Sequence, residues 1–248
     1  MLSVHSVNKS YLIGGKWSKI RQQVLKDIRF QCAEGECLGI VGESGSGKST
    51  LGRLLLGMER PDQGSILFDG KSVSDRKTRT GSMSVVFQDY KSSMNPFYSI
   101  EQVIREPLRR QKLTAREQDR KIDDLLSVVG LDRTFRKRYP HELSGGQAQR
   151  VCIARAISTE PRCLLLDEAI SSLDATVQIQ ILHLLQHLKQ TLRISYLFIT
   201  HDIQAAAYLC DSMLFLHQGQ VVEKIRTHQL KDVQSVYAQK LIHAMGTG

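Results

Sequence analysis

The sequence has no long hydrophobic run and no recognisable leader. Its apolar stretches are short, as in Cys163 to Leu166, whereas a membrane-spanning helix needs roughly 20 apolar residues. The first residues alternate between apolar and polar and lack a basic segment followed by an apolar one, so we expect no signal peptide. These absences argue against a membrane-spanning or exported chain and favour a soluble globular protein.

Cysteine is scarce and offers no obvious metal site. The chain has five cysteines, an odd number, and no pair has the spacing of a metal finger. Free cysteine is among the most buried residue types, so we expect reduced, buried thiols in a reducing cytosol. The five cysteines are Cys32, Cys37, Cys152, Cys163 and Cys210.

The net charge is +9, and the basic residues are most concentrated between Arg105 and Arg138. A solvated helical surface is the simplest interpretation. A surface that lies close to anionic lipid on the cytoplasmic side is the alternative. No aromatic residues interleave with these charges as a stacking platform would require, so we expect no nucleic-acid partner.

The chain contains no internal repeat, low-complexity tract or dividing linker, so we expect a single domain over residues 1–248. Residues 1–34 are predicted to form short strands, and residues 92–157 to be mostly helical. A short tail follows at 226–248.

The second half of the chain alternates between predicted strands and helices, which is typical of a mainly parallel sheet covered by helices. We therefore expect an α/β protein in which the helical middle is an insertion. The expected elements are strand 162–167, helix 175–190, strand 195–200, helix 203–210 and strand 212–217.

A complete phosphate-loop pattern follows a short apolar strand at 36–41. Glycines let successive backbone N–H groups point at phosphate oxygens, and the helix that starts near Lys48 directs its positive end at the same anion. We expect Lys48 to reach the β- and γ-phosphates and the Ser49 hydroxyl to bind Mg²⁺. The pattern predicts a nucleoside triphosphate site made of Gly42, Glu43, Ser44, Gly45, Ser46, Gly47, Lys48, Ser49 and Thr50.

Two carboxylates, Asp167 and Glu168, end the apolar strand that starts near Leu164. The carboxyl ends of parallel strands face the ligand crevice. Asp167 is expected to hold Mg²⁺ through water, as the partner of Ser49. Glu168 is the expected general base for an attacking water.

A further motif lies between the phosphate loop and the acid pair, at Leu143, Ser144, Gly145, Gly146 and Gln147. Serine is a favoured N-cap, so Ser144 is expected to cap a helix that runs to about Ser158. Two glycines would let a phosphate approach this helix start closely. The motif resembles the signature sequence of the ABC ATPases.

The resemblance implies a RecA-like P-loop NTPase core with an N-terminal antiparallel β subdomain and an inserted helical subdomain. It also implies ATP and Mg²⁺ as ligands, with the signature of one subunit closing over the phosphate loop of another. Residue by residue, Gln88 resembles the glutamine that contacts Mg²⁺ and γ-phosphate, and His201 the histidine that touches γ-phosphate. Tyr11 resembles the aromatic residue that stacks on adenine. The loop that crosses to the partner matches Ser171, Ser172, Leu173 and Asp174.

Two stretches of the sequence indicate which group of the family it resembles most. Residues 87–96 and 146–156 are similar to the ATPases of peptide and nickel importers. Alanine at position 169, where proline is commoner, is similar to the nickel-importer subunits. The resemblance therefore favours an importer for nickel or a nickel–metallophore complex, with di- or oligopeptides as the open alternative.

Three other functions fit less well. The Ser-Ser-Met-Asn-Pro stretch argues against an exporter motor. Fewer than 100 residues lie between Lys48 and Ser144, without sustained heptads, so a chromosome or DNA-repair ATPase is disfavoured. Translation-associated relatives carry two such domains per chain, whereas this sequence shows one, so that function is also disfavoured.

For an importer, the resemblance implies several partners and a location. They are a second ATPase subunit, more often a paralogue than an identical chain, two membrane permeases and, indirectly, an extracytoplasmic binding protein. The chain would then lie on the cytoplasmic face of the inner membrane.

Overall fold

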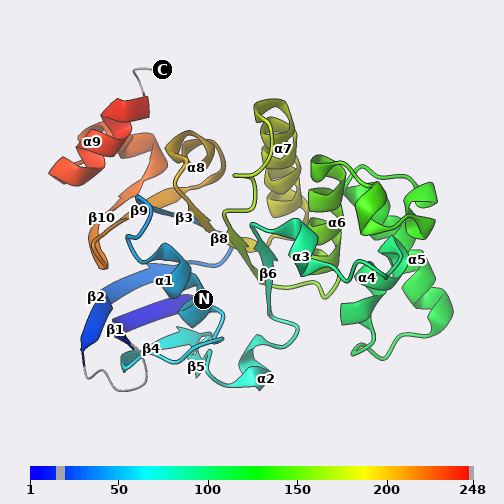
Figure 1. The fold of residues 1–248 in the computed structure, drawn as a ribbon, viewed down its shortest axis with the longest axis horizontal. Coiled ribbons are helices and arrows are strands. Elements are labelled where there is room, and N and C mark those ends of the chain that lie inside the picture. The colour runs from blue at the N-terminus through cyan, green and yellow to red at the C-terminus, as the bar shows by residue number, and fades with distance from the viewer. Residues whose placement is uncertain (15–19, 246–248) are drawn as a thin grey trace. The chain divides into compact units, whose positions relative to one another are not determined.

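A computed structural model of the protein describes residues 1–14 and 20–245 (Figure 1). The chain forms two compact units. The first is made of Met1–Thr80 and Ser195–Gly248, and the second is Gly81–Ile194. The predicted single domain, with its helical part at 92–157, stays a prediction. Of the predicted tail at 226–248, the last three residues lie outside the described part.

An antiparallel sheet occupies the N-terminal part of the first unit. Its strand order is β2-β1-β4-β5. The expectation of short strands is wrong here, because β1 has 11 residues and β2 has 12. The strands are β1 (Leu2–Leu12), β2 (Arg21–Cys32), β4 (Gln63–Phe68) and β5 (Lys71–Ser72).

An irregularity changes which side of β2 is buried. Asp27 has a positive φ of 46°, and the register with β1 shifts on either side of this position. Leu25 is buried on the N-terminal side of Asp27, and Ile28 on its C-terminal side, so the spacing of the buried positions is three. Strict alternation back from Ile28 would have buried Lys26. A β-bulge therefore lets the strand keep apolar residues in the core on both sides of Asp27.

The first unit also holds four strands in the order β10-β9-β3-β8. β3 pairs in parallel with β8 and β9, and β10 pairs antiparallel with β9. Every residue of β3 and β8 is buried, which is typical of parallel strands covered on both faces. The strands are β3 (Cys37–Val41), β8 (Ser195–Thr200), β9 (Ser212–His217) and β10 (Gln220–Arg226).

The predictions for β8 and β9 are confirmed to the residue, whereas β10 was not predicted. β10 alternates exposed and half-buried positions, so it lacks the apolar run that marks its neighbours. Helices complete the unit, and α9 packs against α8 and β10 (Figure 1). The helices are α1 (Lys48–Leu55), α2 (Arg76–Arg79), α8 (Ile203–Leu209), α9 (Val236–Met245) and the 3-10 helix η3 (Thr227–Asp232).

The second unit combines a parallel strand pair with helices. β6 pairs with β7, and Phe87 lies opposite Asp167 at their carboxyl ends. Gly130 follows α5 with a φ of +73°, which confirms the predicted helix stop. The elements are β6 (Met83–Phe87), α3 (Tyr90–Ser93), α4 (Ile100–Leu108), α5 (Ala115–Val128), η1 (Arg133–Lys137), η2 (Pro140–Glu142), α6 (Gly145–Ile157), β7 (Cys163–Asp167) and α7 (Ala175–Leu192).

Several arginines of the basic region are paired with carboxylates in this unit. Arg136 makes ion pairs with Glu101, Asp119 and Asp123 at 2.9 to 3.0 Å. Arg105 also pairs with Asp119, at 2.5 Å. These two guanidinium groups, Arg105 first, hold the pKa of the Asp119 carboxyl below its usual value. These two arginines are therefore paired with carboxylates of their own unit, and both interpretations of the basic region stay predictions.

All five cysteines are buried, as predicted. Burial raises the pKa of the Cys32 thiol to about 12 and also raises the pKa of Cys152. Among residues 1–14 and 20–245, no helix has the length and apolar character needed to cross a membrane.

Candidate functional site

The phosphate loop connects the buried strand β3 to the start of α1. Gly47 is the N-cap of α1 and has a φ of +107°, and Gly45 has a φ of +79°. Both values lie in the left-handed region, where glycine is favoured because it has no Cβ. A Cβ built on Gly45 would meet no atom within 4 Å, so the backbone is open on that side. The loop therefore has the room that a phosphate group needs for close approach.

Lys48 lies under this loop and is bound to its backbone. Its side chain is buried, with 7% of the residue's surface exposed. The Lys48 Nζ donates hydrogen bonds to the carbonyl oxygens of Gly42 at 2.6 Å and Glu43 at 2.9 Å. A buried ammonium group needs such partners. The two carbonyl groups hold the positive charge against the backbone of the loop.

The end of β9 and the turn that follows it contact the phosphate loop. A Cβ at Gly42 would lie 2.2 Å from the carbonyl oxygen of Leu216, so only glycine fits at that position. The Gly219 N–H donates to the carbonyl oxygen of Ser46 at 3.0 Å. The sequence patterns gave no sign of these contacts, because they join segments about 170 residues apart.

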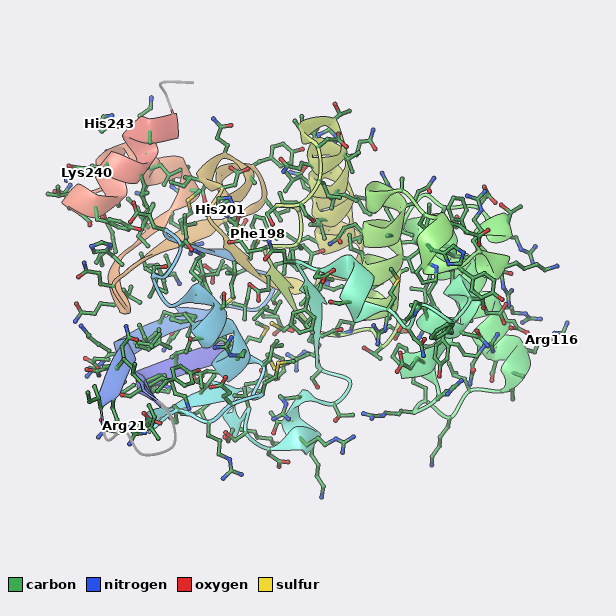
Figure 2. The ribbon with its side chains drawn as sticks, in the orientation of Figure 1. Arg21, Arg116, Phe198, His201, Lys240 and His243 are labelled. Carbon is green, nitrogen blue, oxygen red and sulfur yellow. The ribbon has the colours of Figure 1, made fainter. Side chains whose placement is uncertain are left out.

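His201 follows β8 directly and is exposed (Figure 2). Thr200 lies opposite Val41 in the parallel register of β8 and β3. His201 and Gly42 are the residues that follow this pair. The first unit thus brings His201 and the start of the phosphate loop to the same edge of its parallel strands.

Tyr11 lies near the end of β1, and its hydroxyl group is tied to α1 through an acidic residue. The Tyr11 hydroxyl donates to Glu59 Oε2 at 2.5 Å, and Arg53 Nε donates to Glu59 Oε1 at 2.6 Å. These two hydrogen bonds, that of Tyr11 first, lower the pKa of Glu59. The ring is half-buried, and the Lys9 ammonium lies 5.3 Å from its centre. Glu59 and Arg53 were not among the predicted site residues.

The acid pair ends β7 in the second unit. Glu168 has a φ of +50°, which is unusual for a residue other than glycine, asparagine or aspartate. Its carbonyl oxygen accepts hydrogen bonds from the Ser171 N–H at 3.2 Å and the Ser171 hydroxyl at 2.9 Å. The start of the predicted partner-crossing loop therefore holds the backbone of the predicted base. Such strain is common at functional sites.

Gln88 lies at the same edge as Asp167. Phe87 and Asp167 are opposite each other in the β6–β7 register, and Gln88 follows Phe87 immediately. Gln88 is exposed, and Asp167 and Glu168 are half-buried. The second unit therefore brings two of the three predicted magnesium ligands, and the predicted base, to one end of a strand pair.

Ser144 caps α6, as predicted. The Ser144 hydroxyl accepts from the Gln147 N–H at 3.3 Å, and Gln147 Oε1 accepts from the Ser144 N–H at 3.1 Å. This reciprocal pair is a capping box. Both polar residues of the signature thus serve its own helix start.

Gly146 has a packing role that the sequence did not indicate. A Cβ at Gly146 would lie 2.6 Å from Cγ1 of Val177, in the first turn of α7. Asp174, the last residue of the predicted partner-crossing loop, caps α7 by accepting from the Val177 N–H at 3.0 Å. The signature helix therefore packs against α7, the helix that Asp174 caps, within one unit.

The predicted site residues fall into two groups. Tyr11, the phosphate loop and His201 belong to the first unit. Gln88, the acid pair, the signature and the partner-crossing loop belong to the second. Each group is collected at strand ends and helix starts, which are the usual places for phosphate and metal ligands in an α/β protein.

Comparison with known proteins gives a family match over more than half of the chain. Residues 25–171 match the sequence model described as ABC transporter. A similar solved structure is a dimeric, post-hydrolysis state of the ATP-binding cassette MJ0796 bound to ADP and Pi. It has a TM-score of 0.80 and 28% identity, and the match covers 92% of this chain and 99% of that one.

Three curated relatives are similar over most of their length. The metal-staphylopine import system ATP-binding protein CntF of Staphylococcus aureus is 42% identical, over 98% of each chain. The nickel import ATP-binding protein NikE of Rhodospirillum rubrum is 40% identical, over 90% of this chain and 83% of its own. The oligopeptide transport ATP-binding protein OppF of Lactococcus lactis is 38% identical, over 93% of this chain and 75% of its own.

Proposed function

The chain belongs to the ABC transporter family, and we propose that it is the ATP-hydrolysing subunit that powers an importer for nickel or a nickel–metallophore complex. The observation that carries the ATPase activity is the phosphate loop. Its buried Lys48 ammonium is held by two loop carbonyl groups, and the backbone is open at Gly45. The family match and the relatives support the same activity.

The first unit supplies the groups that would bind ATP. Backbone N–H groups from Gly45 to Thr50 and the start of α1 favour the negative phosphates. Lys48 adds a full positive charge, and Tyr11 offers a half-buried ring for the adenine. Glu59, through its bond to the Tyr11 hydroxyl, fixes the position of that ring.

Magnesium is the proposed metal, because the predicted ligands are all oxygen donors. A serine hydroxyl, an amide oxygen and a carboxylate suit a small, hard cation. The proposed ligands are Ser49, Gln88 and Asp167. Gln88 and Asp167 lie at the carboxyl end of the β6–β7 strand pair. When bound, Mg²⁺ would neutralise charge on the β- and γ-phosphate oxygens.

Hydrolysis is assigned to Glu168 and His201. Glu168 would orient and deprotonate the attacking water, as a general base at the end of β7. Ser171 holds the Glu168 backbone in its left-handed conformation, which fixes the direction in which the Glu168 side chain leaves the backbone. His201 and Lys48 would stabilise the charge on the transferred phosphoryl group.

A second subunit would complete the site. The capped start of α6 offers backbone N–H groups to an anion, and it is separate from the phosphate loop. We propose that this signature closes over the nucleotide of a partner subunit, and that the partner's signature closes over this one. The partner is proposed to be a paralogue, so that two different ATPase subunits form the motor.

The relatives support the cargo assignment and its alternative. CntF serves a metal-staphylopine import system and NikE nickel import. OppF serves oligopeptide transport, so a peptide importer is the second candidate. This subunit need not touch its cargo, because selection would belong to the permease and binding subunits.

The subunit works as part of an importer and has membrane permeases as partners, as its relatives imply. We further propose two permeases, an extracytoplasmic binding protein and a position on the cytoplasmic face of the inner membrane. Purification of the intact complex, with its subunits identified by mass, tests these finer assignments.

Uptake measurements test the proposal. Cells that lack this gene are supplied with radioactive nickel, alone or with a metallophore, and separately with a labelled oligopeptide. Loss of nickel uptake, restored by the wild-type gene and not by a Lys48→Ala copy, is the expected result. Loss of peptide uptake alone would favour the second candidate, and unchanged uptake of all three would refute an importer for these cargoes.

A further inference from the structure

The C-terminal helix α9 reaches the phosphate loop through one side chain. The Glu43 N–H donates a hydrogen bond to the Tyr237 hydroxyl at 3.0 Å. Glu43 lies in the loop and Tyr237 in the first turn of α9, 194 residues further along the chain. Tyr237 was not among the predicted site residues.

The position of the Tyr237 ring is fixed by its surroundings. Its centre lies 3.9 Å from that of the His217 ring, at an interplanar angle of 31°. The next residue on α9, Ala238, is completely buried and anchors the helix against its neighbours. Figure 2 shows Lys240 and His243 further along the same helix. Burial raises the pKa of Tyr237, so its hydroxyl group stays neutral.

The peptide group between Gly42 and Glu43 links Tyr237 to Lys48. Its N–H, that of Glu43, is bound to the Tyr237 hydroxyl, and its carbonyl oxygen, that of Gly42, accepts a hydrogen bond from Lys48 Nζ at 2.6 Å. A peptide unit is planar, so fixing one of its ends limits rotation of the other. The orientation of the Gly42 carbonyl group, one of the two that hold the Lys48 ammonium, therefore depends on Tyr237.

Backbone groups of β9 and of the turn after it also contact the loop. The Leu216 carbonyl group lies against Gly42, and the Gly219 N–H donates to the Ser46 carbonyl oxygen. Glu43 itself is exposed, and the Tyr237 hydroxyl is the partner of its N–H group. Tyr237 thus adds a side-chain restraint from a distant helix to the corner of the loop that holds Lys48.

We propose that Tyr237 is a positioning residue for the ATPase reaction. By fixing the peptide group between Gly42 and Glu43, it holds the Lys48 ammonium where the triphosphate binds. The role deepens the proposed function and rests on it, because it requires Lys48 to bind phosphate. α9 thereby couples the C-terminal segment to nucleotide affinity.

The test compares Tyr237→Phe with Val236→Ala in the full chain. The first change removes only the hydroxyl group and keeps the ring beside His217. The second is the matched control, because Val236 is the adjacent residue on α9 and is 66% exposed. Three quantities are measured: the Kd for a fluorescent ATP analogue, the hydrogen-exchange rate of the Glu43 amide, and the unfolding temperature.

For Tyr237→Phe we expect the Kd to rise about fivefold, the effect of one neutral hydrogen bond. The Glu43 amide should exchange faster, while the unfolding temperature stays within the range of the control. In the assembled transporter, KM for ATP should rise more than kcat falls. Val236→Ala should match the wild type in all of these measurements.

A Tyr237→Phe chain with wild-type Kd, or with tighter binding, overturns the proposal. A higher Kd with an unchanged Glu43 exchange rate also overturns it, because the effect would not pass through that peptide. If the wild-type chain itself binds no ATP analogue, the proposed function fails instead. The two failures are therefore distinguishable.

Discussion

Gly146 in the signature helix lies so close to Val177 in α7 that an added Cβ would be 2.6 Å from Cγ1 of that valine. Real Cβ contacts are longer, so any larger residue at position 146 must displace a stiff, β-branched side chain. The contact joins the signature helix to the first turn of α7, which Asp174 caps.

Gly146→Ala should lower the free energy of unfolding by about 1–3 kcal/mol, the usual cost of overpacking. Without the close contact, the same change would be neutral or stabilising by up to about 1 kcal/mol, because alanine is the better helix former. Denaturant unfolding of the two chains measures the sign of the change in the free energy of unfolding.

Val177→Ala is the matched test of that interpretation. It removes Cγ1 from a half-buried position. In the double variant, Gly146→Ala should cost much less than it does alone, which a double-mutant cycle measures. Equal costs in both backgrounds would show that the two residues are not coupled.

Lys48→Ala should weaken binding of ATP by about tenfold to a hundredfold, because charged hydrogen bonds contribute about 1.5–3 kcal/mol. Titration with a fluorescent ATP analogue measures the loss. Arg53→Ala is a useful comparison, since it also removes a positive charge, and Arg53 contacts Glu59, Tyr11 and Thr50 rather than the loop carbonyl groups that hold Lys48. Arg53→Ala should weaken ATP binding less than Lys48→Ala does. A larger loss of affinity for Arg53→Ala would show that Lys48 is not the main source of ATP affinity.

Glu168→Gln should bind ATP with nearly unchanged affinity and hydrolyse it about a hundredfold to ten-thousandfold more slowly, the usual range for a general base. The change keeps the size of the side chain and removes its basic group. Single-turnover hydrolysis separates the chemical step from product release. Unchanged turnover would refute the assignment of the base.

The thiols should be unreactive in the folded protein. Burial raises the pKa of Cys32 to about 12, so at pH 8 almost none of it is the reactive thiolate, and Cys152 shifts in the same direction. A colourimetric thiol reagent should find almost no reactive thiol without denaturant and five with it. Rapid reaction of one or more thiols in the native protein would contradict the burial.

Much of the fold could be predicted because it is local. The buried runs that became β8 and β9 are bounded by polar residues, and the Ser144 cap needs only its neighbours in sequence. β10 was missed because an edge strand with alternating exposure has no distinctive apolar pattern. The lengths of β1 and β2 were missed because bulges at Ser6 and Asp27 interrupt their periodicity.

The candidate site divides in the same way. The loop around Lys48 and the acid pair are contiguous motifs, so sequence alone located them. The supports of these motifs are not contiguous. Tyr237 contacts Glu43 from the far end of the chain, and Leu216 contacts Gly42 from β9. No local pattern encodes such contacts, because they depend on how distant segments pack.

The measurement that tests the account most directly is the molecular mass, by light scattering, of the Glu168→Gln chain mixed with its partner ATPase subunit. With Mg²⁺ and ATP, the account predicts a two-subunit particle that does not form without nucleotide and is lost when Ser144→Arg blocks the signature. A chain that binds ATP tightly and still remains a single protomer under these conditions would contradict it.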